Sequence, residues 1–146
     1  MYLLIFFHCA ILIIGGHYTY AEVPLFDWLR EVFDQSRNNY DKLGHFAQGF
    51  VPAMIARELL IRQEVISKTS WLPFIVISIA LAISAAYELI EWAVSVSTCE
   101  GGDSFLGTQG YVWDTQSDML YATIGAIVAL LTLSKIHNKQ LLKCKK

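Results

Sequence analysis

Histidine, carboxylate and amide side chains recur at helical spacing in three stretches of an otherwise apolar sequence. Within each set the residues lie four and then three positions apart, which places their side chains on one face of a helix. The three sets are Asp41, His45 and Gln48; Ser84, Glu88, Glu91 and Ser95; and Asp114, Asp118 and Tyr121. Because imidazole and carboxylate groups serve as metal ligands and as general acids or bases, the chemistry indicated is cation binding or acid–base catalysis.

The sequence that must position these side chains is apolar enough to cross a membrane. Hydrophobic residues make up 55% of the 146 residues, and the mean hydropathy is +0.44. A helix rises about 1.5 Å per residue and the hydrocarbon core is about 30 Å thick, so a span needs roughly 20 mostly apolar residues. Four runs reach or approach this length, at residues 3–16, 43–61, 71–94 and 115–134. We therefore expect an all-α polytopic bundle of about four transmembrane helices in one domain.

The first run, at residues 3–16, also has a second interpretation as a signal peptide. No basic residue precedes it, however, and residues 19–21 form a poor cleavage site. We expect a membrane span that is truncated at its start, with further spans missing upstream.

Residues 24–37 combine an apolar stripe with a charged face. Pro24 suits the first turn of a helix, where a missing N–H costs nothing. The apolar stripe consists of Leu25, Phe26, Leu29, Val32 and Phe33. This pattern predicts an amphipathic helix lying in the outer membrane interface, and the alternative is a short soluble helix packed on the bundle.

The distribution of lysine and arginine predicts the orientation, since basic residues accumulate in cytoplasmic loops. The segment 135–146 carries five lysines, and Arg57, Arg62 and Lys68 flank the link between the second and third runs. Residues 95–113 contain neither lysine nor arginine, although Arg37 and Lys42 on the same side weaken the signal. We expect a multi-pass membrane protein with a basic cytoplasmic tail at residues 135–146.

This orientation brings all three polar sets to the outer side of the membrane. Charged groups near the bilayer centre cost at least about 2.5–3.5 kcal/mol each, so they normally face the bundle interior or a wet cavity. The sequence therefore predicts that three helices turn their polar faces toward one another and enclose an outward-facing cavity.

The predicted cavity has more acids than bases, with Lys42 as its one fixed cation. Five carboxylates cannot all stay ionised at close range, so either some hold protons or a cation binds. The candidate metal ligands are His17, Asp41, His45, Glu88, Glu91, Asp114 and Asp118. Such a mixture suits a divalent cation such as Zn²⁺, Mn²⁺ or Mg²⁺, and no motif specifies which of them is the cofactor.

Each candidate also has a structural explanation. Asp114 would cap the fourth helix, and His45 would pair with the acid one turn before it. Glu88 and Glu91 would form a hydrogen-bond network between helices, while His17 would anchor the chain at the membrane interface.

The glycine-rich residues 95–113 lack the ending of a phosphate-binding loop. They form either a flexible connection or a lid that folds Gln109 back over the mouth of the cavity.

Several motifs resemble those of a known family. The segments GGHYTYAEVPLFDWLRE, YDKLGHFAQGFVPAMIARELL, YELIEW and FLGTQGYVWDTQSDMLYATIGA resemble the bacterial inner-membrane proteins typified by YjdF, a family of unknown function. The resemblance covers about residues 17–140. Since members of that family usually have more spans before the first one here, it implies a chain that is short at its N-terminus.

A second similarity is to VanZ-like membrane proteins. The matching residues are Asp41, Lys42, His45, Phe46, Glu88, Glu91 and Asp118. Glu91 stands where glutamine is commoner, and Ala122 stands about where asparagine is expected. This similarity would imply an envelope role, associated with tolerance of glycopeptide antibiotics, without an established reaction.

Two functions are compatible with the sequence. The first is a membrane-embedded hydrolase or transferase acting on a lipid-linked or amphiphilic substrate, with His45, Glu91 and Asp118 as catalytic candidates. The substrate-binding candidates in that case are Lys42, Gln48 and Gln109. The second is a non-catalytic membrane protein, as a homo-oligomer or a partner subunit, that binds or relays a cation or proton. The balanced charge argues against nucleic acid as a partner of either.

Overall fold

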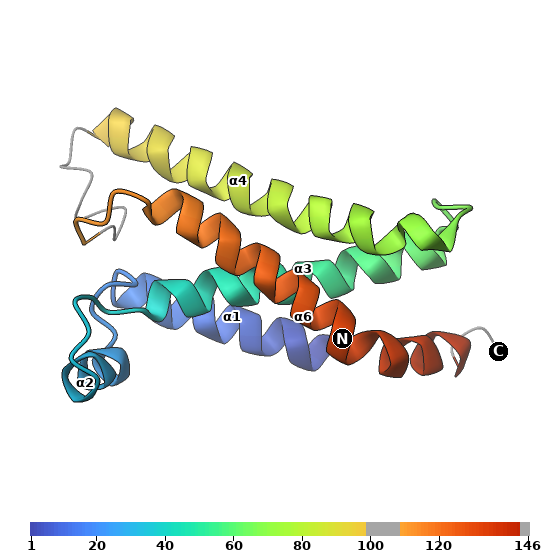
Figure 1. Ribbon diagram of the computed structural model, residues 1–146, viewed down its shortest axis with the longest axis horizontal. Coiled ribbons are helices and arrows are strands. Elements are labelled where there is room, and N and C mark those ends of the chain that lie inside the picture. The colour runs from blue at the N-terminus through green and yellow to red at the C-terminus, as the bar shows by residue number, and fades with distance from the viewer. Residues whose placement is uncertain (99–108, 144–146) are drawn as a thin grey trace.

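The computed structural model describes residues 1–98 and 109–143, and these are helical without any strand (Figure 1). In chain order the elements are α1 (Tyr2–His17), α2 (Pro24–Val32), α3 (Tyr40–Arg62), the short 3₁₀ helix η1 (Thr69–Trp71), α4 (Leu72–Thr98) and α6 (Asp114–Lys143). The predicted all-α class is confirmed.

Two of these helices are long and apolar enough to cross a membrane. They are α4, within Thr69–Ser97, and α6, within Asp114–Leu142, with mean hydropathies of 2.0 and 1.8 over their most apolar windows. Helix α1 is apolar but has only 16 residues, and α3 has 23 residues interrupted by polar side chains. That α1 and α3 also cross the membrane stays a prediction, and so does the expected total of about four transmembrane spans.

Helix α6 continues through the segment predicted as a basic tail, as far as Lys143, and the place where the membrane span ends stays a prediction. His137 and Leu141 are only 5% and 8% exposed, so this part of the helix still packs against the bundle. Lys135 and Lys139 lie on its exposed side.

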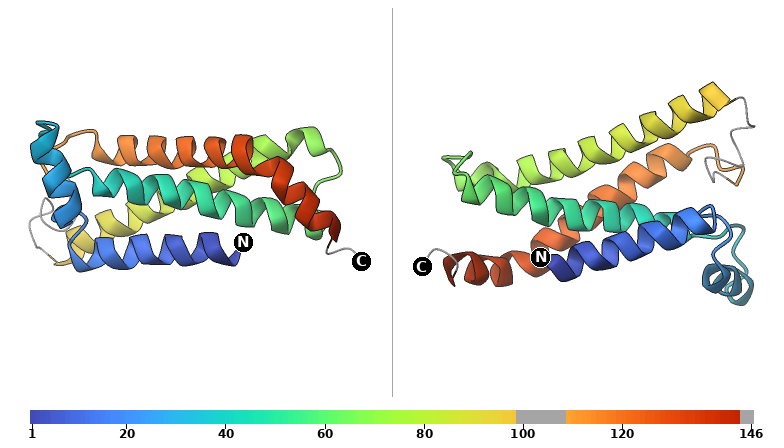
Figure 2. Two further views of the ribbon diagram at one scale, coloured as in Figure 1. Left: turned by 90° about the horizontal axis from the view of Figure 1, so that it is seen from below. Right: turned by 180° about the vertical axis from the view of Figure 1, so that it is seen from behind.

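Helix α2 is shorter than the predicted interfacial helix at residues 24–37. It ends at Val32, and Asp34 then adopts a left-handed backbone conformation with φ of 49°. The helix stands at one end of the bundle, beside the first residues of α3 (Figures 1 and 2). Leu25, Val32 and Phe33 remain exposed, which is consistent with a helix that meets a membrane surface.

Helix α3 is the central element and contacts α1, α4 and α6. It approaches α6 closely where small residues face each other: a side chain at Gly49 would collide with the backbone of Ala122, and one at Gly125 would collide with the backbone of Phe46. Small residues allow such backbone contact between membrane helices. The apolar core lies just beyond this contact, at the fully buried Ala53, Val76, Ala80 and Ala126.

Two tyrosines donate hydrogen bonds to carbonyl oxygens of α1. Tyr40 is the first residue of α3 and so joins the two helices, whereas Tyr20 belongs to the link that follows α1. Tyr40 donates a hydrogen bond to the carbonyl oxygen of Ile11 (2.9 Å), and Tyr20 donates one to that of Leu12 (3.2 Å).

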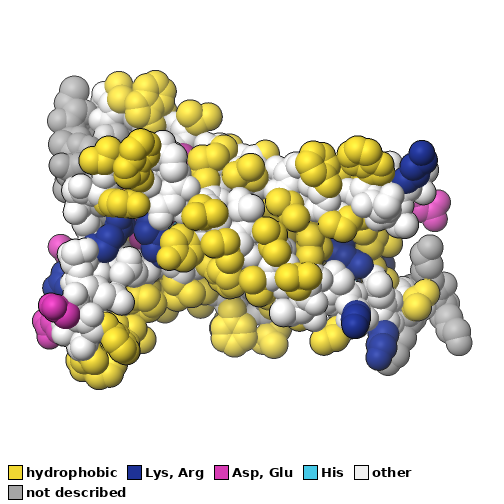
Figure 3. All heavy atoms as spheres, in the orientation of Figure 1, with side chains coloured by type: hydrophobic (Ala, Val, Ile, Leu, Met, Phe, Trp, Pro, Cys, Tyr) yellow, Lys and Arg dark blue, Asp and Glu magenta, His cyan; other side chains and the backbone are white. Residues whose placement is uncertain are grey.

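On the surface of the molecule, hydrophobic side chains cover the middle of the face shown in Figure 3, with charged side chains toward its two ends. This arrangement suits a molecule surrounded by lipid at its middle.

Candidate functional site

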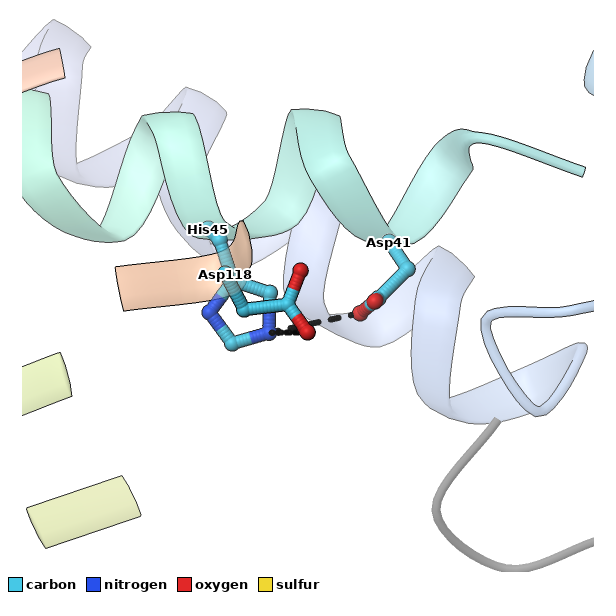
Figure 4. Close-up of side chains that lie close together, drawn as sticks. All are labelled: Asp41, His45 and Asp118. Atoms are coloured by element: carbon cyan, nitrogen blue, oxygen red, sulfur yellow. Dashed lines mark ion pairs between the residues drawn. The ribbon is translucent and has the colours of Figure 1, made fainter. Parts of the chain in front are cut away.

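The first turns of α3 and α6 bring an imidazole and two carboxylates together at one end of the bundle. His45 points its Nε2 atom toward Asp41 Oδ1, at 3.4 Å, and toward Asp118 Oδ2, at 3.9 Å (Figure 4). All three residues are buried, and each offers a ligand atom within 4.8 Å of the others. The close contact at Gly49 and Gly125, one or two turns further in, explains why side chains from the two helices meet here.

Helix α4 adds two glutamates to this group. Glu88 Oε1 lies 3.6 Å from His45 Nε2, and the Glu88 side chain is only 9% exposed. Glu91, one turn on, lines a cavity of about 90 Å³ together with Glu88, Asp114, Asp118 and the two α3 residues. Side chains of α3, α4 and α6 therefore line one cavity.

Two cations, not one, hold the acids on the α6 side. Lys42 Nζ donates hydrogen bonds to Asp118 Oδ1 (2.7 Å) and Asp114 Oδ1 (3.0 Å). Arg37 donates a further hydrogen bond to Asp114 and lies 3.8 Å from Asp41. Sequence reasoning missed Arg37 because this residue precedes the helix, although its position four residues before Asp41 was an available signal.

The balance of fixed charge at the site remains negative. Five carboxylates surround two cationic side chains, so full ionisation would leave three negative charges, or two if His45 were protonated. Buried charges are tolerated only when they are paired or coordinate an ion. The site therefore needs either protons or a cation to compensate its acids.

Some buried polar atoms of the site lack a hydrogen-bond partner among the described residues. They are His45 Nδ1, Glu88 Oε1 and Ser84 Oγ. Ser84 is fully buried one turn below Glu88 on α4. Since buried polar atoms are normally satisfied, these atoms mark a place where a further ligand would be stabilised.

A second, smaller cavity of about 20 Å³ lies on the other side of His45, between α1, α3 and α4. Gln48 and Glu91 line it together with Leu12, Tyr20 and Tyr87. Burial raises the pKa of the Tyr20 phenol, so this side chain remains a neutral hydrogen-bond donor. The cavity has room for about one water molecule.

The structure does not bring His17 or Gln109 into the group. His17 ends α1 in an exposed position, with its ring 4.7 Å from that of Tyr18. Gln109 instead clamps the backbone of Asn38, accepting from its N–H (2.9 Å) and donating to its carbonyl (3.0 Å). The remainder of the predicted lid, residues 99–108, lies outside the described residues.

An all-helical chain with membrane-length helices and a buried cluster of acids and imidazole defines the class as a helical membrane protein. Residues 1–139 match the family described as "Predicted membrane protein (DUF2238)". The chain is also 51% identical over 141 residues to the inner membrane protein YjdF of Escherichia coli (strain K12), covering 97% of this chain and 68% of that one.

The chain belongs to this DUF2238 family of predicted membrane proteins, and by its relationship to YjdF it is an inner-membrane protein. The resemblance to YjdF-type proteins is confirmed, whereas the similarity to VanZ-like proteins is not supported. No solved structure matches the chain.

Proposed function

We propose that this chain is a multi-pass inner-membrane protein of about four spans whose buried site binds a divalent cation from the outer side. The observation that carries the proposal is the group of Asp41, His45 and Asp118, whose ligand atoms lie within 4.8 Å of one another in a buried, acid-rich cavity. A divalent cation would offset most of the unbalanced negative charge without any new protein group.

The distances in the group support coordination of one ion. Two ligand atoms that are each about 2.0–2.2 Å from a metal lie roughly 3–4 Å apart. The separations from His45 Nε2 to Asp41, Glu88 and Asp118 are 3.4, 3.6 and 3.9 Å, so small rotations would suffice. An imidazole among carboxylates favours Zn²⁺ or Mn²⁺ over Ca²⁺.

Metal content and metal affinity test this function. Protein purified in detergent without chelator should carry about one Zn²⁺ or Mn²⁺ per chain by elemental analysis. Asp118→Asn should lower the affinity for the metal ion by about 100-fold or more, because it removes a direct ligand. Loss of a residue that only hydrogen-bonds to a ligand already lowers metal affinity about 10–100-fold. His17→Ala is the matched control, since this histidine lies outside the group. Folded wild-type protein that binds neither ion in a calorimetric titration would refute the proposal.

A second candidate function is catalysis on an amphiphilic substrate, and the position of Glu91 favours it. Glu91 lines both cavities beside His45, and the smaller one is walled by Leu12, Tyr20 and Tyr87. A carboxylate beside a bound metal is placed to act as a general base while the metal polarises the substrate. In this reaction His45 and Asp118 would be metal ligands.

Glu91→Gln separates the two functions. If the site is catalytic, this variant keeps its cation affinity within about threefold, since Glu91 is outside the three-residue group. It should lose turnover of a membrane-lipid extract followed by mass spectrometry, by 10²-fold or more. If wild-type protein with bound metal turns over no lipid in that extract, the catalytic candidate is dropped and cation binding alone remains.

A further inference from the structure

A second polar cluster, in which Arg57 and His137 are buried, joins α3 and α6 at the end of the bundle opposite the acid site. Arg57 donates hydrogen bonds to His137 Nδ1 (2.7 Å) and to the side-chain oxygen of Asn138. His137 Nε2 lies 3.3 Å from Glu58 Oε2, and Glu58 Oε1 accepts from Arg62 Nε at 2.7 Å. The cluster was not apparent from the sequence, because its residues belong to two helices about 80 positions apart.

The balance of charge in this cluster is positive. Arg57 is only 5% exposed, and no carboxylate of the described residues lies within 4.0 Å of its guanidinium group. Because a guanidinium can only donate, His137 Nδ1 accepts and the ring is neutral, with its proton on Nε2 toward Glu58. The positive charge of Arg57 is therefore not balanced by a carboxylate of the described residues, and a buried cation without a full counter-charge is costly.

An open hollow of about 610 Å³ adjoins the cluster. One side is polar, formed by Glu58, Arg62 and His137, and the other is apolar, formed by residues that include Ile5 and Leu59. Leu59 is 55% exposed, so the apolar side continues onto the outer surface of the helices. A hollow with these two sides fits an amphiphile that has an anionic head and a hydrocarbon tail.

We propose that this end of the molecule binds an anionic phospholipid of the cytoplasmic leaflet. The headgroup phosphate lies against Arg62 and the positively charged cluster, and an acyl chain runs along Ile5 and Leu59. Basic hollows between membrane helices on the cytoplasmic side are suited to such headgroups. Lysines on the exposed side of α6, such as Lys135 and Lys139, strengthen the same field. This site is independent of the cation site, which lies at the other end of α3.

Lipid-dependent thermal stability tests the proposal on the full chain in detergent. Phosphatidylglycerol should raise the melting temperature and remain bound in native mass spectrometry, whereas phosphatidylcholine and inorganic phosphate should do neither. Arg62→Gln should weaken binding of phosphatidylglycerol by about fivefold, which corresponds to about 1 kcal/mol for one basic residue. Arg62→Lys should retain most of the affinity, since a phosphate accepts either cation.

Arg30→Gln provides a matched control, because Arg30 is an exposed arginine of α2 that pairs with Asp27 at the opposite end of the molecule. It should leave phosphatidylglycerol binding unchanged. Equal stabilisation by phosphatidylglycerol and phosphatidylcholine would overturn the proposal, whatever the variants do. Equal losses in Arg62→Gln and Arg30→Gln would overturn it too, since binding would then follow net charge alone. Protection by inorganic phosphate at equal concentration would assign the site to a free anion instead.

Discussion

At the scale of single residues, Lys42 determines how the acids of the outer site coexist. Its ammonium group bonds Asp114 and Asp118 from α3, so one cation both neutralises charge and joins two helices. Arg37 makes a parallel contact to Asp114 from the segment before α3. These contacts leave the second carboxylate oxygen of Asp118, Oδ2, directed toward His45 and the cavity.

Lys42→Met should destabilise the folded protein, because it leaves two buried carboxylates with less compensation. Breaking one partner of a buried ion pair costs about 3–5 kcal/mol. Thermal denaturation in detergent, followed by tryptophan fluorescence, should show a clear fall in melting temperature that added Zn²⁺ or Mn²⁺ partly restores. Arg30→Met, which breaks an exposed pair with Asp27, should cost less than about 1 kcal/mol. Equal losses in the two variants would contradict this role of Lys42.

The acidity of the medium should govern cation binding at the same residues. A histidine or carboxylate must lose its proton before it ligates a metal, so affinity should fall as the pH falls. Titrations of wild-type protein with Mn²⁺ at a series of pH values from about 8 to about 5 should show that the affinity for Mn²⁺ falls as the pH is lowered. Affinity that stays constant over this range would argue against His45 as a ligand.

At the scale of the elements, two glycines control the distance between α3 and α6. A Cβ atom at Gly49 would overlap the backbone of Ala122, and one at Gly125 would overlap that of Phe46. This contact is what brings His45 of α3 within reach of Asp118 of α6. The positions of the site residues therefore depend on a packing feature that lies outside the site.

Gly49→Ala should force α3 and α6 apart and destabilise the bundle. Overpacking typically costs about 1–3 kcal/mol, and the loss should appear as lower abundance in the membrane and a lower melting temperature. Gly16→Ala is the matched control, since nothing lies within 4 Å of a side chain there. It should be neutral or stabilising, because alanine favours a helix over glycine. A Gly49→Ala variant as stable as Gly16→Ala would contradict the close contact.

Helical spacing predicts much of the site, since residues four and three positions apart share a helix face. Asp41, His45 and Asp118 follow from that rule together with the orientation of the spans. Arg37 and the clamp between Asn38 and Gln109 do not follow, because their contacts join segments more than 70 residues apart without any periodic pattern. The ends of α2 and α6 also escape prediction, because tertiary packing decides how far a partly polar helix continues.

At the scale of the whole molecule, the two buried polar clusters have opposite character. Acids predominate where α3 and α6 begin, near α2, and guanidinium groups predominate toward the other end of the α3–α6 pair. An apolar core that includes Val76 and Ala126 separates them. This polarity agrees with a cytoplasmic C-terminus, since basic residues accumulate on the cytoplasmic side.

Cysteine labelling in intact cells tests that orientation. In a background with Cys9, Cys99 and Cys144 replaced by serine, Val112→Cys should react with a membrane-impermeant maleimide. Lys139→Cys should react only after the membrane is permeabilised. Val112 is 85% exposed and Lys139 is exposed too, so accessibility in the folded protein does not limit either reaction. The reverse pattern would place the acid site in the cytoplasm.

The most direct test of the account is a map of the ion itself. Crystals or particles prepared with Mn²⁺ or Zn²⁺ should show one strong peak, anomalous in the crystal case, about 2.0–2.2 Å from His45 Nε2 and from oxygen atoms of Asp41 and Asp118. The peak should vanish in Asp118→Asn. A metal-saturated sample with no peak there, or with these three side chains turned apart toward the lipid, would contradict the claim that they form one cation site.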